Sequence, residues 1–403
     1  MAERSPAAIA RAIGLARKPL VLEPSGASGW FGGMSLVCAD PVADTHGADL
    51  REAASALEAV MNAEEPLLAA AIVPYDGTGC RIRLYRGGLM RTDGGWEPWG
   101  EPGDLRADDL GEPPVPAASP APETPLLADA RFDLAKADYL ARVEAVRSAI
   151  RDGDVYVLNL TMRLQGTLRT DVAAAFEALL GSSAGPMSAM WAAEESAIVS
   201  VSPERFLAVT AESPRTGGVR HAEIQPIKGT RPRGADPVTD ARLAAELAAS
   251  AKERAEHLMI VNLERNDLGR VCETGSVIVE PLFEVFATPY CHQLVSGVRG
   301  RLRPDATIAE LLEAAFPCGS VTGAPKIAAM RLIRELEVTP RGAYTGALVV
   351  AMPGRMDSSV LIRTLELDGT TARWGTGGGI TIDSDPEAEW LEALLKARPV
   401  LGG

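Results

Sequence analysis

Apolar and polar positions alternate over short distances in the first hundred residues. Apolar runs at 19–23 and 69–73 are bounded by turn residues, which predicts two strands. Between them, the apolar residues of 49–62 recur with helical spacing. The N-terminal part is therefore expected to combine short strands with a helix.

From residue 126 onward the pattern predicts helices and strands in alternation. Tyr139, Val143 and Val146 share one face of a helix expected over 135–151. Further helices are predicted at 240–268, 327–336 and 386–397. Strands are predicted at 155–164, 197–201, 277–286, 294–302, 343–351, 359–367 and 372–374. Because the two types intermix without a strict βαβ order, we expect an α+β (mixed α/β) core rather than a barrel.

A segment rich in proline and acidic residues, 101–125, separates these two parts. Such a segment buries too little apolar surface to fold alone, so it is expected to be a linker or a long surface loop. The chain is thus divided into an N-terminal region, 1–125, and a region of candidate chemistry, 126–403. We expect the two regions to form one intertwined structural unit.

The composition limits the partners and the compartment. A net charge of −14 over 403 residues argues against nucleic acid, and a small anionic substrate would need local cations or a metal. The five cysteines lack zinc-like spacing and are expected to be free thiols in a reducing cytosol. Neither a secretory leader nor an apolar run long enough to span a bilayer is visible, so a cytoplasmic protein without a membrane partner is expected.

One lysine, Lys228, lies in a segment that predicts a tight turn, 226–231. It is followed by Gly229, which lets a ligand or another backbone approach closely. A desolvated lysine in such a place can act as an amine nucleophile. For an isolated turn a solvated surface lysine is the simpler interpretation, so the choice depends on other parts of the chain.

Two Glu-x-x-Glu sequences supply carboxylates on separate predicted helices. Glu253 and Glu256 share a helix face, and Glu389 and Glu392 do the same near the start of the last helix. Carboxylates at a helix start are also favourable for dipole reasons alone. If the two pairs converge, however, they form a hard oxygen site suited to Mg²⁺.

Two glycine-rich segments and one arginine are further candidates. Segment 319–326 departs from the P-loop pattern, and 375–379 departs from the dinucleotide-binding pattern. Each is either a tight turn or a set of backbone N–H donors for a carboxylate. Arg363 lies in an apolar predicted strand, so it is expected to hold a carboxylate of the protein or of a ligand. The four histidines show no metal-binding spacing.

These motifs, in this order, resemble the chorismate-utilising enzymes over residues 132–401. The matching segments are Ser202-Pro-Glu-Arg-Phe206, Pro226-Ile-Lys-Gly-Thr230, Glu256-His-Leu-Met-Ile-Val261, Arg265-Asn-Asp-Leu-Gly269, Gly319-Ser-Val-Thr-Gly-Ala-Pro-Lys326, Arg341-Gly-Ala-Tyr344 and Ser384-Asp-Pro-Glu-Ala-Glu389. Leu22-Glu-Pro-Ser25 lies where the family has its tryptophan-pocket motif. The resemblance implies a large two-layered antiparallel β-sheet core with flanking helices.

The lysine makes the chain most similar to component I of the aminodeoxychorismate synthases, whereas anthranilate synthases have alanine at this position. The resemblance implies that the Lys228 amine attacks C2 of chorismate and that Glu204 acts as general acid and base. It implies that Mg²⁺ is surrounded by Glu253, Glu256, Glu389 and Glu392. It implies that the substrate carboxylates are held by Gly229, Thr230, Tyr344, Arg363, Gly378, Gly379 and Lys396.

The implied activity is the Mg²⁺-dependent conversion of chorismate and ammonia to 4-amino-4-deoxychorismate, a step toward para-aminobenzoate and folate. Ammonia is expected from a separate glutamine amidotransferase subunit or from free ammonium, because the chain shows no nucleophilic-cysteine elbow. Four residues depart from the family pattern, namely Val157 for glutamine, Asn262 for aspartate, Gln293 for histidine (with His292 one position early) and Cys318 for glycine. They leave two alternatives open: a diverged enzyme of the anthranilate, isochorismate or salicylate synthase type, and a chorismate-binding subunit without turnover.

Overall fold

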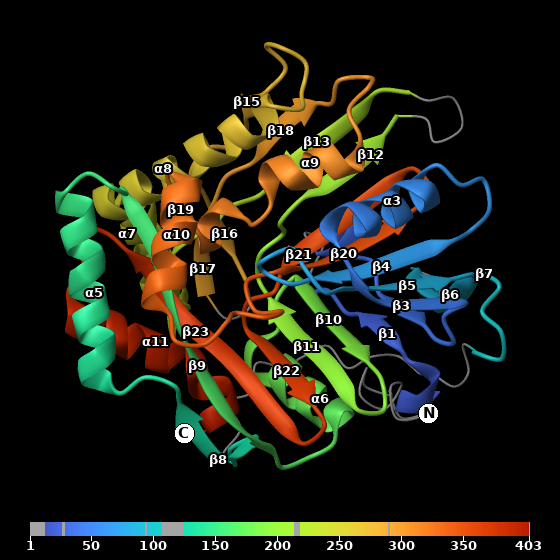
Figure 1. Ribbon diagram of the computed structural model, residues 1–403, viewed down its shortest axis with the longest axis horizontal. Coiled ribbons are helices and arrows are strands. Elements are labelled where there is room, and N and C mark those ends of the chain that lie inside the picture. Colours follow the sequence, from blue (N-terminus) through green and yellow to red (C-terminus); the bar gives the residue numbers. More distant parts are fainter. Residues whose placement is uncertain are drawn as a thin grey trace.

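Two antiparallel β-sheets stack face to face, and helices cover their outer faces (Figure 1). The computed structural model describes residues 13–25, 29–92, 95–106, 124–212, 218–288 and 291–402. This arrangement confirms the expected α+β fold with a two-layered antiparallel sheet core.

The first sheet contains the strands that carry most of the glycine-rich segments. Its order is β19 (Gly323–Ala324), β9 (Val157–Leu168), β23 (Thr371–Ile380), β22 (Thr364–Asp368), β11 (Ser196–Ser202), β10 (Met187–Ala192), β1 (Leu20–Leu22), β2 (Leu36–Cys38), β6 (Gly87–Thr92) and β7 (Gly95–Gly100), with β8 (Leu127–Phe132) beside β9. The long β9–β23 pair is its central feature, and it brings residues more than two hundred positions apart into register.

A second sheet and a small third sheet complete the strands. The second has the order β15 (Ile278–Val279), β18 (Val298–Arg301), β13 (Arg220–Ile224), β12 (Ala208–Ala211), β21 (Arg355–Val360), β20 (Ala347–Met352), β4 (Leu68–Val73), β5 (Cys80–Tyr85) and β3 (Ala43–Ala48). The third has the order β14 (Ile227–Pro232), β17 (Cys291–Val295) and β16 (Glu284–Ala287).

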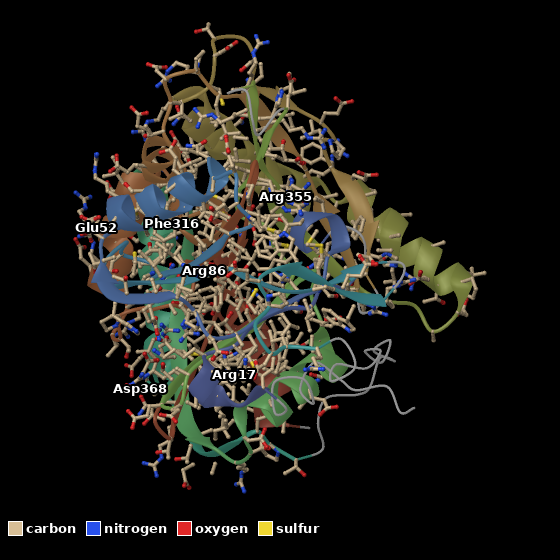
Figure 2. The ribbon with its side chains drawn as sticks, turned by 90° about the vertical axis from the view of Figure 1, so that its right-hand side faces the viewer. Arg17, Glu52, Arg86, Phe316, Arg355 and Asp368 are labelled. Carbon is tan, nitrogen blue, oxygen red and sulfur yellow. The ribbon has the colours of Figure 1, made fainter. Side chains whose placement is uncertain are left out.

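The helices form two outer layers. They are α3 (Leu50–Met61), α5 (Lys136–Arg151), α6 (Val172–Ser183), α7 (Pro237–Ala249), α8 (Ala251–Gly269), α9 (Ile308–Ala315), α10 (Lys326–Leu336) and α11 (Pro386–Leu401), with short turns α2 (Trp30–Gly33), η1 (Leu15–Arg17) and η2 (Gly319–Val321). Apolar side chains of α5, α10 and α11 pack on β9 and β23, and those of α3, α8 and α9 pack on the second sheet. Figure 2 labels the exposed Glu52 of α3 and the buried Phe316 of this second layer.

Strands from both regions of the sequence share the two large sheets. β1 pairs with β10, and β4 pairs with β20. Most of the expected linker, residues 107–123, lies outside the described residues. The division at residue 125 therefore stays a prediction.

Two predicted elements are interrupted. The single helix expected over 240–268 is two helices, because Ser250 leaves the helical conformation and its side chain caps α8 by accepting from the Glu253 N–H. Serine favours such cap positions over helix interiors. The strand expected over 277–286 is split between β15 and β16, with Pro281, which cannot donate to a sheet, between them.

Three local predictions about the glycine segments and Arg363 are wrong. The segment 226–231 is largely strand β14 rather than a turn, and 375–379 belongs to β23 rather than to a loop. Arg363 lies between β21 and β22 with φ of 48°, not inside one continuous strand. The partners of β14 and β23, which are β17 and β9, are distant in sequence, so local patterns could not identify these two strands.

Candidate active site

Lys228 lies on β14 beside a β-bulge. The register with β17 shifts between Lys228 and Thr230, and Gly229 between them has φ of +78°. A bulge re-aims the side chains beside it, and this backbone conformation favours glycine. A Cβ on Gly229 would also lie 2.9 Å from Glu253 Oε2. The bulge therefore directs the lysine and lets its strand lie against α8.

Glu204 is a buried carboxyl that follows β11, with 4% of its surface exposed. The next residue, Arg205, fixes this turn through hydrogen bonds of 2.8 and 3.0 Å to the Asp357 carboxylate. Burial raises the pKa of Glu204 to about 7, although contact with Ser320 and the charge of Lys228 lower it. Its Oε1 has no hydrogen-bond partner among the described residues. A carboxyl that titrates near neutral pH with a free oxygen is suited to general acid–base catalysis.

Ser320, in η2, connects the lysine with this carboxyl. Lys228 Nζ donates a hydrogen bond of 3.4 Å to the Ser320 carbonyl oxygen. The Ser320 hydroxyl hydrogen-bonds the Glu204 carboxylate, which lowers the pKa of Glu204. Ser320 thus contacts both the Lys228 amine and the Glu204 carboxyl, which can donate a proton.

Two glycines of β23 form the floor beside Lys228. A Cβ on Gly379 would lie 3.1 Å from Lys228 Nζ, and a Cβ on Gly378 would lie 3.1 Å from Glu389 Oε2. Because neither residue has a side chain, Lys228 and Glu389 approach the backbone of β23 closely, and Gly379 is partly exposed beside the lysine. Lys396 Nζ donates 2.7 Å to the Gly377 carbonyl oxygen, which adds a cation to the same floor.

The two glutamate pairs come from α8 and α11, as the spacing predicted. Asp385 caps α11 and Pro386 is its first residue. Each carboxylate has a polar partner: Glu253 has Arg231 at 3.4 Å, Glu256 has Lys252 at 3.8 Å, Glu389 has Ser384 at 2.7 Å and Glu392 has Lys396 at 2.7 Å.

The charges of the two pairs act on each other. Burial raises the pKa of Glu256, and the charges of Glu253 and Glu389 raise it further, while Lys252 and Lys228 lower it. Burial also raises the pKa of Glu389, and Glu392 adds to that shift. The carboxylates of α8 and α11 therefore lie within electrostatic reach of each other and of Lys228.

This carboxylate set fits Mg²⁺ by its chemistry. No group of three or more His, Cys, Asp or Glu side chains in the part of the chain that the structure describes is arranged to ligate a metal directly. Mg²⁺ usually keeps several waters and needs few protein oxygens, so a closed protein cage is not required. A divalent cation would also relieve the repulsion that raises the pKa values of Glu256 and Glu389.

Tyr344 and Arg363 are two further side chains that were predicted to bind the substrate. The Tyr344 ring packs on Gly375, where a Cβ would lie 2.2 Å from the ring, and Arg163 stacks on it at 4.8 Å. Arg363 is partly exposed, and its guanidinium forms no hydrogen bond or ion pair with any described residue. Burial lowers the pKa of Arg363. An unpaired, partly buried guanidinium is a ready partner for a ligand carboxylate.

Two of the four departures lie next to the lysine. Val157 is buried, and its Cγ2 lies 3.8 Å from the position of a Cβ on Gly379. An apolar side chain therefore borders the floor at that point. Cys318 is buried beside Ser320, with 3.2 Å between Sγ and the serine Oγ. Asn262, by contrast, is exposed on α8 and accepts a hydrogen bond from Arg265.

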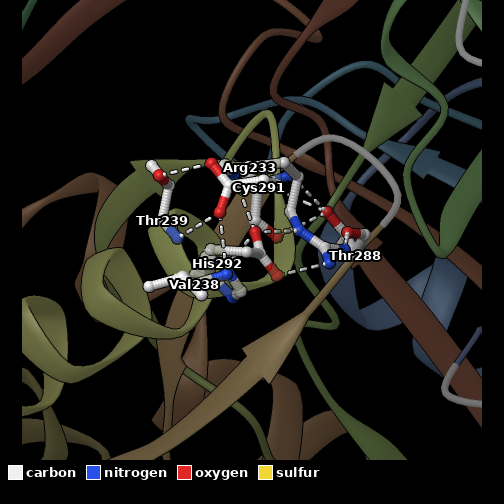
Figure 3. Close-up of polar contacts among 9 residues, drawn as sticks. Arg233, Val238, Thr239, Thr288, Cys291 and His292 are labelled. Atoms are coloured by element: carbon white, nitrogen blue, oxygen red, sulfur yellow. Dashed lines mark hydrogen bonds and ion pairs between the residues drawn. The ribbon is translucent and has the colours of Figure 1, made fainter.

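Neither His292 nor Gln293 reaches Lys228. His292 Nε2 lies 2.8 Å from Asp240 Oδ1 of α7, within a polar cluster that includes Arg233 (Figure 3). Gln293 lies opposite Thr230 and lines a pocket of about 220 Å³ together with Ile227 and Val295. Thr230 itself is exposed. The Lys228 amine bonds the Ser320 carbonyl oxygen, whereas the His292 ring bonds Asp240. This geometry therefore gives no support for a role of the His292 imidazole beside Lys228.

Sequence reasoning missed Ser320 as a connecting residue and Glu264 as a buried one. Ser320 lies inside a recognised motif, but its role depends on contacts with distant strands. Glu264 is fully buried, and it lies three residues after Val261 and four before Leu268, both buried. That helical spacing was a readable signal of a charged residue on an apolar face.

The raised pKa of Glu204 predicts a pH-dependent stability difference. A carboxyl whose pKa is raised on folding favours the folded state at low pH, and this contribution is lost as pH rises from about 4.5 through about 7. Glu204→Gln stays neutral, so its free energy of unfolding should exceed that of the wild type by about 2 kcal/mol more at pH 8 than at pH 5. Chemical denaturation at both pH values measures this. Glu194→Gln, at an exposed position, is the control, and an equal effect at both pH values for Glu204→Gln would contradict the prediction.

The remaining sequence expectations concern thiols and membranes. The five cysteines are free, as predicted, and all five are buried. None of the helices in the described residues is long and apolar enough to cross a membrane.

Comparison with known proteins places these residues in context. The sequence profile described as chorismate binding enzyme matches residues 98–402. The aminodeoxychorismate synthase of Streptomyces pristinaespiralis is 47% identical over 264 residues, which are 65% of this chain and 36% of that protein. Aminodeoxychorismate synthase component 1 of Escherichia coli K12 is 41% identical over 286 residues, 70% of this chain and 61% of that protein. The chain thus matches less than two thirds of the length of each relative.

A solved structure shares the fold. Anthranilate synthase component I from Streptococcus pneumoniae superimposes with a TM-score of 0.74 and 26% identity, over 91% of each chain. The chain is therefore similar to aminodeoxychorismate synthases in sequence and to an anthranilate synthase in structure, and the choice between the two reactions depends on the site.

Proposed function

The chain belongs to the chorismate-binding enzyme family, and on this premise we propose that it aminates chorismate at C4, as component I of an aminodeoxychorismate synthase. The observation that carries the proposal is the placement of Lys228. Its nitrogen lies over the open backbone at Gly379 and is joined through Ser320 to Glu204, a carboxyl that titrates near neutral pH. A nucleophile and a proton donor are the two groups that this substitution needs.

In the first step the uncharged Lys228 amine forms a bond to C2 of chorismate. Both ring double bonds shift, and the bond between C4 and its hydroxyl breaks. Glu204 gives its proton to that hydroxyl, which leaves as water, and Glu204 remains as a carboxylate. The buried position of Glu204 supports this role, because burial keeps the proton available at neutral pH.

In the second step ammonia forms a bond to C4. Both double bonds shift back, the bond between C2 and Lys228 breaks, and the lysine leaves as an amine. The new ammonium group returns one proton to Glu204. The net change is chorismate plus ammonia to 4-amino-4-deoxychorismate plus water, so Lys228 and Glu204 end as they began.

The other predicted residues would bind the substrate. Arg363, Lys396 and Tyr344 would hold its two carboxylates, together with the backbone of Gly229, Thr230, Gly378 and Gly379. The unpaired guanidinium of Arg363 supports this assignment. Glu253, Glu256, Glu389 and Glu392 would hold Mg²⁺, which when bound supplies positive charge beside the ring carboxylate. Ammonia would come from a separate glutamine amidotransferase subunit in the cytosol.

One assay tests the proposal. The pure chain is incubated with chorismate, MgCl₂ and ammonium, and the product is identified by chromatography and mass spectrometry. We expect aminodeoxychorismate, with turnover lost on addition of EDTA and restored by excess Mg²⁺. Anthranilate, isochorismate or salicylate would contradict the proposal, and unchanged chorismate, even with a glutaminase added, would indicate a binding subunit.

A further inference from the structure

A second buried carboxyl, Glu264 of α8, lies behind the Lys228 and Glu204 pair and takes no part in the proposed steps. It is 0% exposed. Its Oε1 accepts a hydrogen bond of 2.9 Å from the Gly319 N–H, and its Oε2 has no partner among the described residues. A Cβ on Gly319 would lie 2.7 Å from Oε1, so the glycine lets η2 settle directly on this carboxyl. Burying a carboxyl that lacks a partner for one oxygen costs free energy, so its presence here needs an explanation.

The Cys318 thiol links Glu264 to Ser320. Its Sγ lies 3.6 Å from Glu264 Oε1 and 3.2 Å from Ser320 Oγ. Burial raises the pKa of Cys318 well above its usual value, and the charges of Glu264 and Glu204 raise it further, so the thiol keeps its proton. It is therefore a hydrogen-bond donor between two oxygens. Glycine, the residue that the family pattern has here, has no side chain and could not donate this hydrogen bond.

The placement of the thiol and hydroxyl protons determines which way the Ser320 hydroxyl points. The thiol and the serine hydroxyl each carry one proton. When the thiol donates to Ser320 Oγ, the serine proton is left for Glu204. Glu264 acts on the same residue through the backbone, because the hydrogen bond that its Oε1 accepts from the Gly319 N–H fixes η2, where Ser320 lies. Glu264 and Cys318 thus act together on the position of the hydroxyl that contacts the general acid.

We propose that Glu264 and Cys318 are positioning residues, which hold Ser320 so that its hydroxyl faces Glu204 and its carbonyl oxygen faces Lys228. This inference rests on the proposed function, because it assigns these residues to the 4-amination. Three segments supply the contacts: α8 carries Glu264, the loop around η2 carries Cys318 and Ser320, and β14 carries Lys228. Neither positioning residue touches the substrate in this account.

A purely structural role is the competing explanation. Lys326 Nζ lies 2.6 Å from Asp267 Oδ2 and donates 2.7 Å to the Ala315 carbonyl oxygen. Glu264 could serve only to balance the charge of this lysine. In that case Glu264→Gln and Glu264→Leu would be equally harmful to stability, and neither would act specifically on the chemical step. An acceptor role predicts that glutamine substitutes for glutamate and leucine does not.

The experiment compares matched pairs of variants in the full chain. For Glu264→Leu we expect kcat to fall about tenfold with the KM for chorismate within about twofold, because one positioning hydrogen bond is lost. Glu264→Gln, which keeps the acceptor, should stay within about twofold of the wild type. Cys318→Ala should lower kcat about threefold, and Cys318→Ser, which keeps a donor, should restore it. Cys272→Ala, at a buried cysteine away from the site, is the control. Thermal unfolding identifies any variant that fails to fold.

A second readout does not need turnover. The titration of Glu204 is followed by its infrared carboxyl band, identified as the band that Glu204→Gln lacks. Glu264→Leu and Cys318→Ala should move this titration upward by about one pH unit, because the lowering contact from Ser320 is lost. Glu264→Gln and Cys318→Ser should leave it in place.

The outcomes separate the two proposals. Wild-type kcat and an unmoved Glu204 titration in both Glu264→Leu and Cys318→Ala would overturn the positioning role, as would equal damage from Glu264→Gln and Glu264→Leu. A wild-type chain that makes no aminodeoxychorismate overturns the proposed function, and the Glu204 titration then still decides whether Glu264 and Cys318 position Ser320.

Discussion

Replacing Lys228 by alanine should reduce the formation of aminodeoxychorismate by about 1000-fold or more and leave a slow formation of anthranilate, through attack of ammonia at C2 and loss of the side chain as pyruvate. The shortened side chain cannot bond to C2, so the covalent step is lost. C2 is then open to direct attack by ammonia, while Glu204 and the four glutamates remain. Chromatography of the products from chorismate, Mg²⁺ and ammonium measures both compounds in one run.

The matched control for this variant is Lys252→Ala. Lys252 is an exposed lysine of α8 whose Nζ lies 3.8 Å from Glu256. Its loss removes a positive charge from the same region without removing the nucleophile. We expect it to keep aminodeoxychorismate as the product. A Lys228→Ala variant that still made aminodeoxychorismate within tenfold of the wild-type rate would show that the lysine is not the nucleophile.

Glu204→Gln should lower kcat by about 100- to 10,000-fold at neutral pH, with little change in the KM for chorismate. The amide keeps the size of the carboxyl and can still accept from Ser320, but it cannot give a proton to the leaving hydroxyl. Steady-state kinetics of product formation measure this, with Glu194→Gln as the control at an exposed position. Equal kcat values for Glu204→Gln and the wild type would rule out general acid catalysis by this residue.

The same Glu204→Gln variant is expected to be less active and, at alkaline pH, more stable. Burial raises the pKa of Glu204, so the wild type carries an energetic cost once the carboxyl ionises. Such a cost is typical of a group kept for chemistry rather than for stability. A structural carboxyl would show the opposite relation between the two measurements.

Local signals in the sequence predicted the helices that carry the glutamates. The i,i+3 spacing of Glu389 and Glu392, with Asp385 as cap and Pro386 as first residue, depends only on neighbouring residues. The free state of the cysteines followed from composition and spacing in the same way, whereas their burial was not predicted. Family motifs in a fixed order supplied the sheet architecture, which periodicity alone left undecided between mixed arrangements.

Local signals could not predict the contacts between distant segments. The bulge at Gly229 exists because β14 pairs with β17, and Gly379 holds its place beside Lys228 because β23 pairs with β9. The break at Ser250 depends on a cap that competes with helix continuation, which a periodic pattern does not reveal. Arg363 looked like part of a strand, because its apolar neighbours conceal the turn between β21 and β22.

In the structure, the departures from the family pattern differ in their exposure and in their contacts with the site around Lys228. Asn262 is exposed and remote from the lysine's contacts, whereas Cys318 lies against Ser320. Val157 lies beside Gly379, and it has an apolar side chain where the family pattern has glutamine. These two positions are where the chemistry of this chain has room to differ from that of its relatives.

The central claim is that Lys228 bonds covalently to the substrate during 4-amination. It is tested most directly by mass spectrometry of the wild-type chain mixed with chorismate and Mg²⁺ in the absence of ammonia, followed by peptide mapping. The account predicts an adduct with the mass of chorismate less one water, located on Lys228, removed on addition of ammonium and absent from Lys228→Ala. Aminodeoxychorismate formed by a chain that never carries this adduct, or an adduct on another residue, would contradict it.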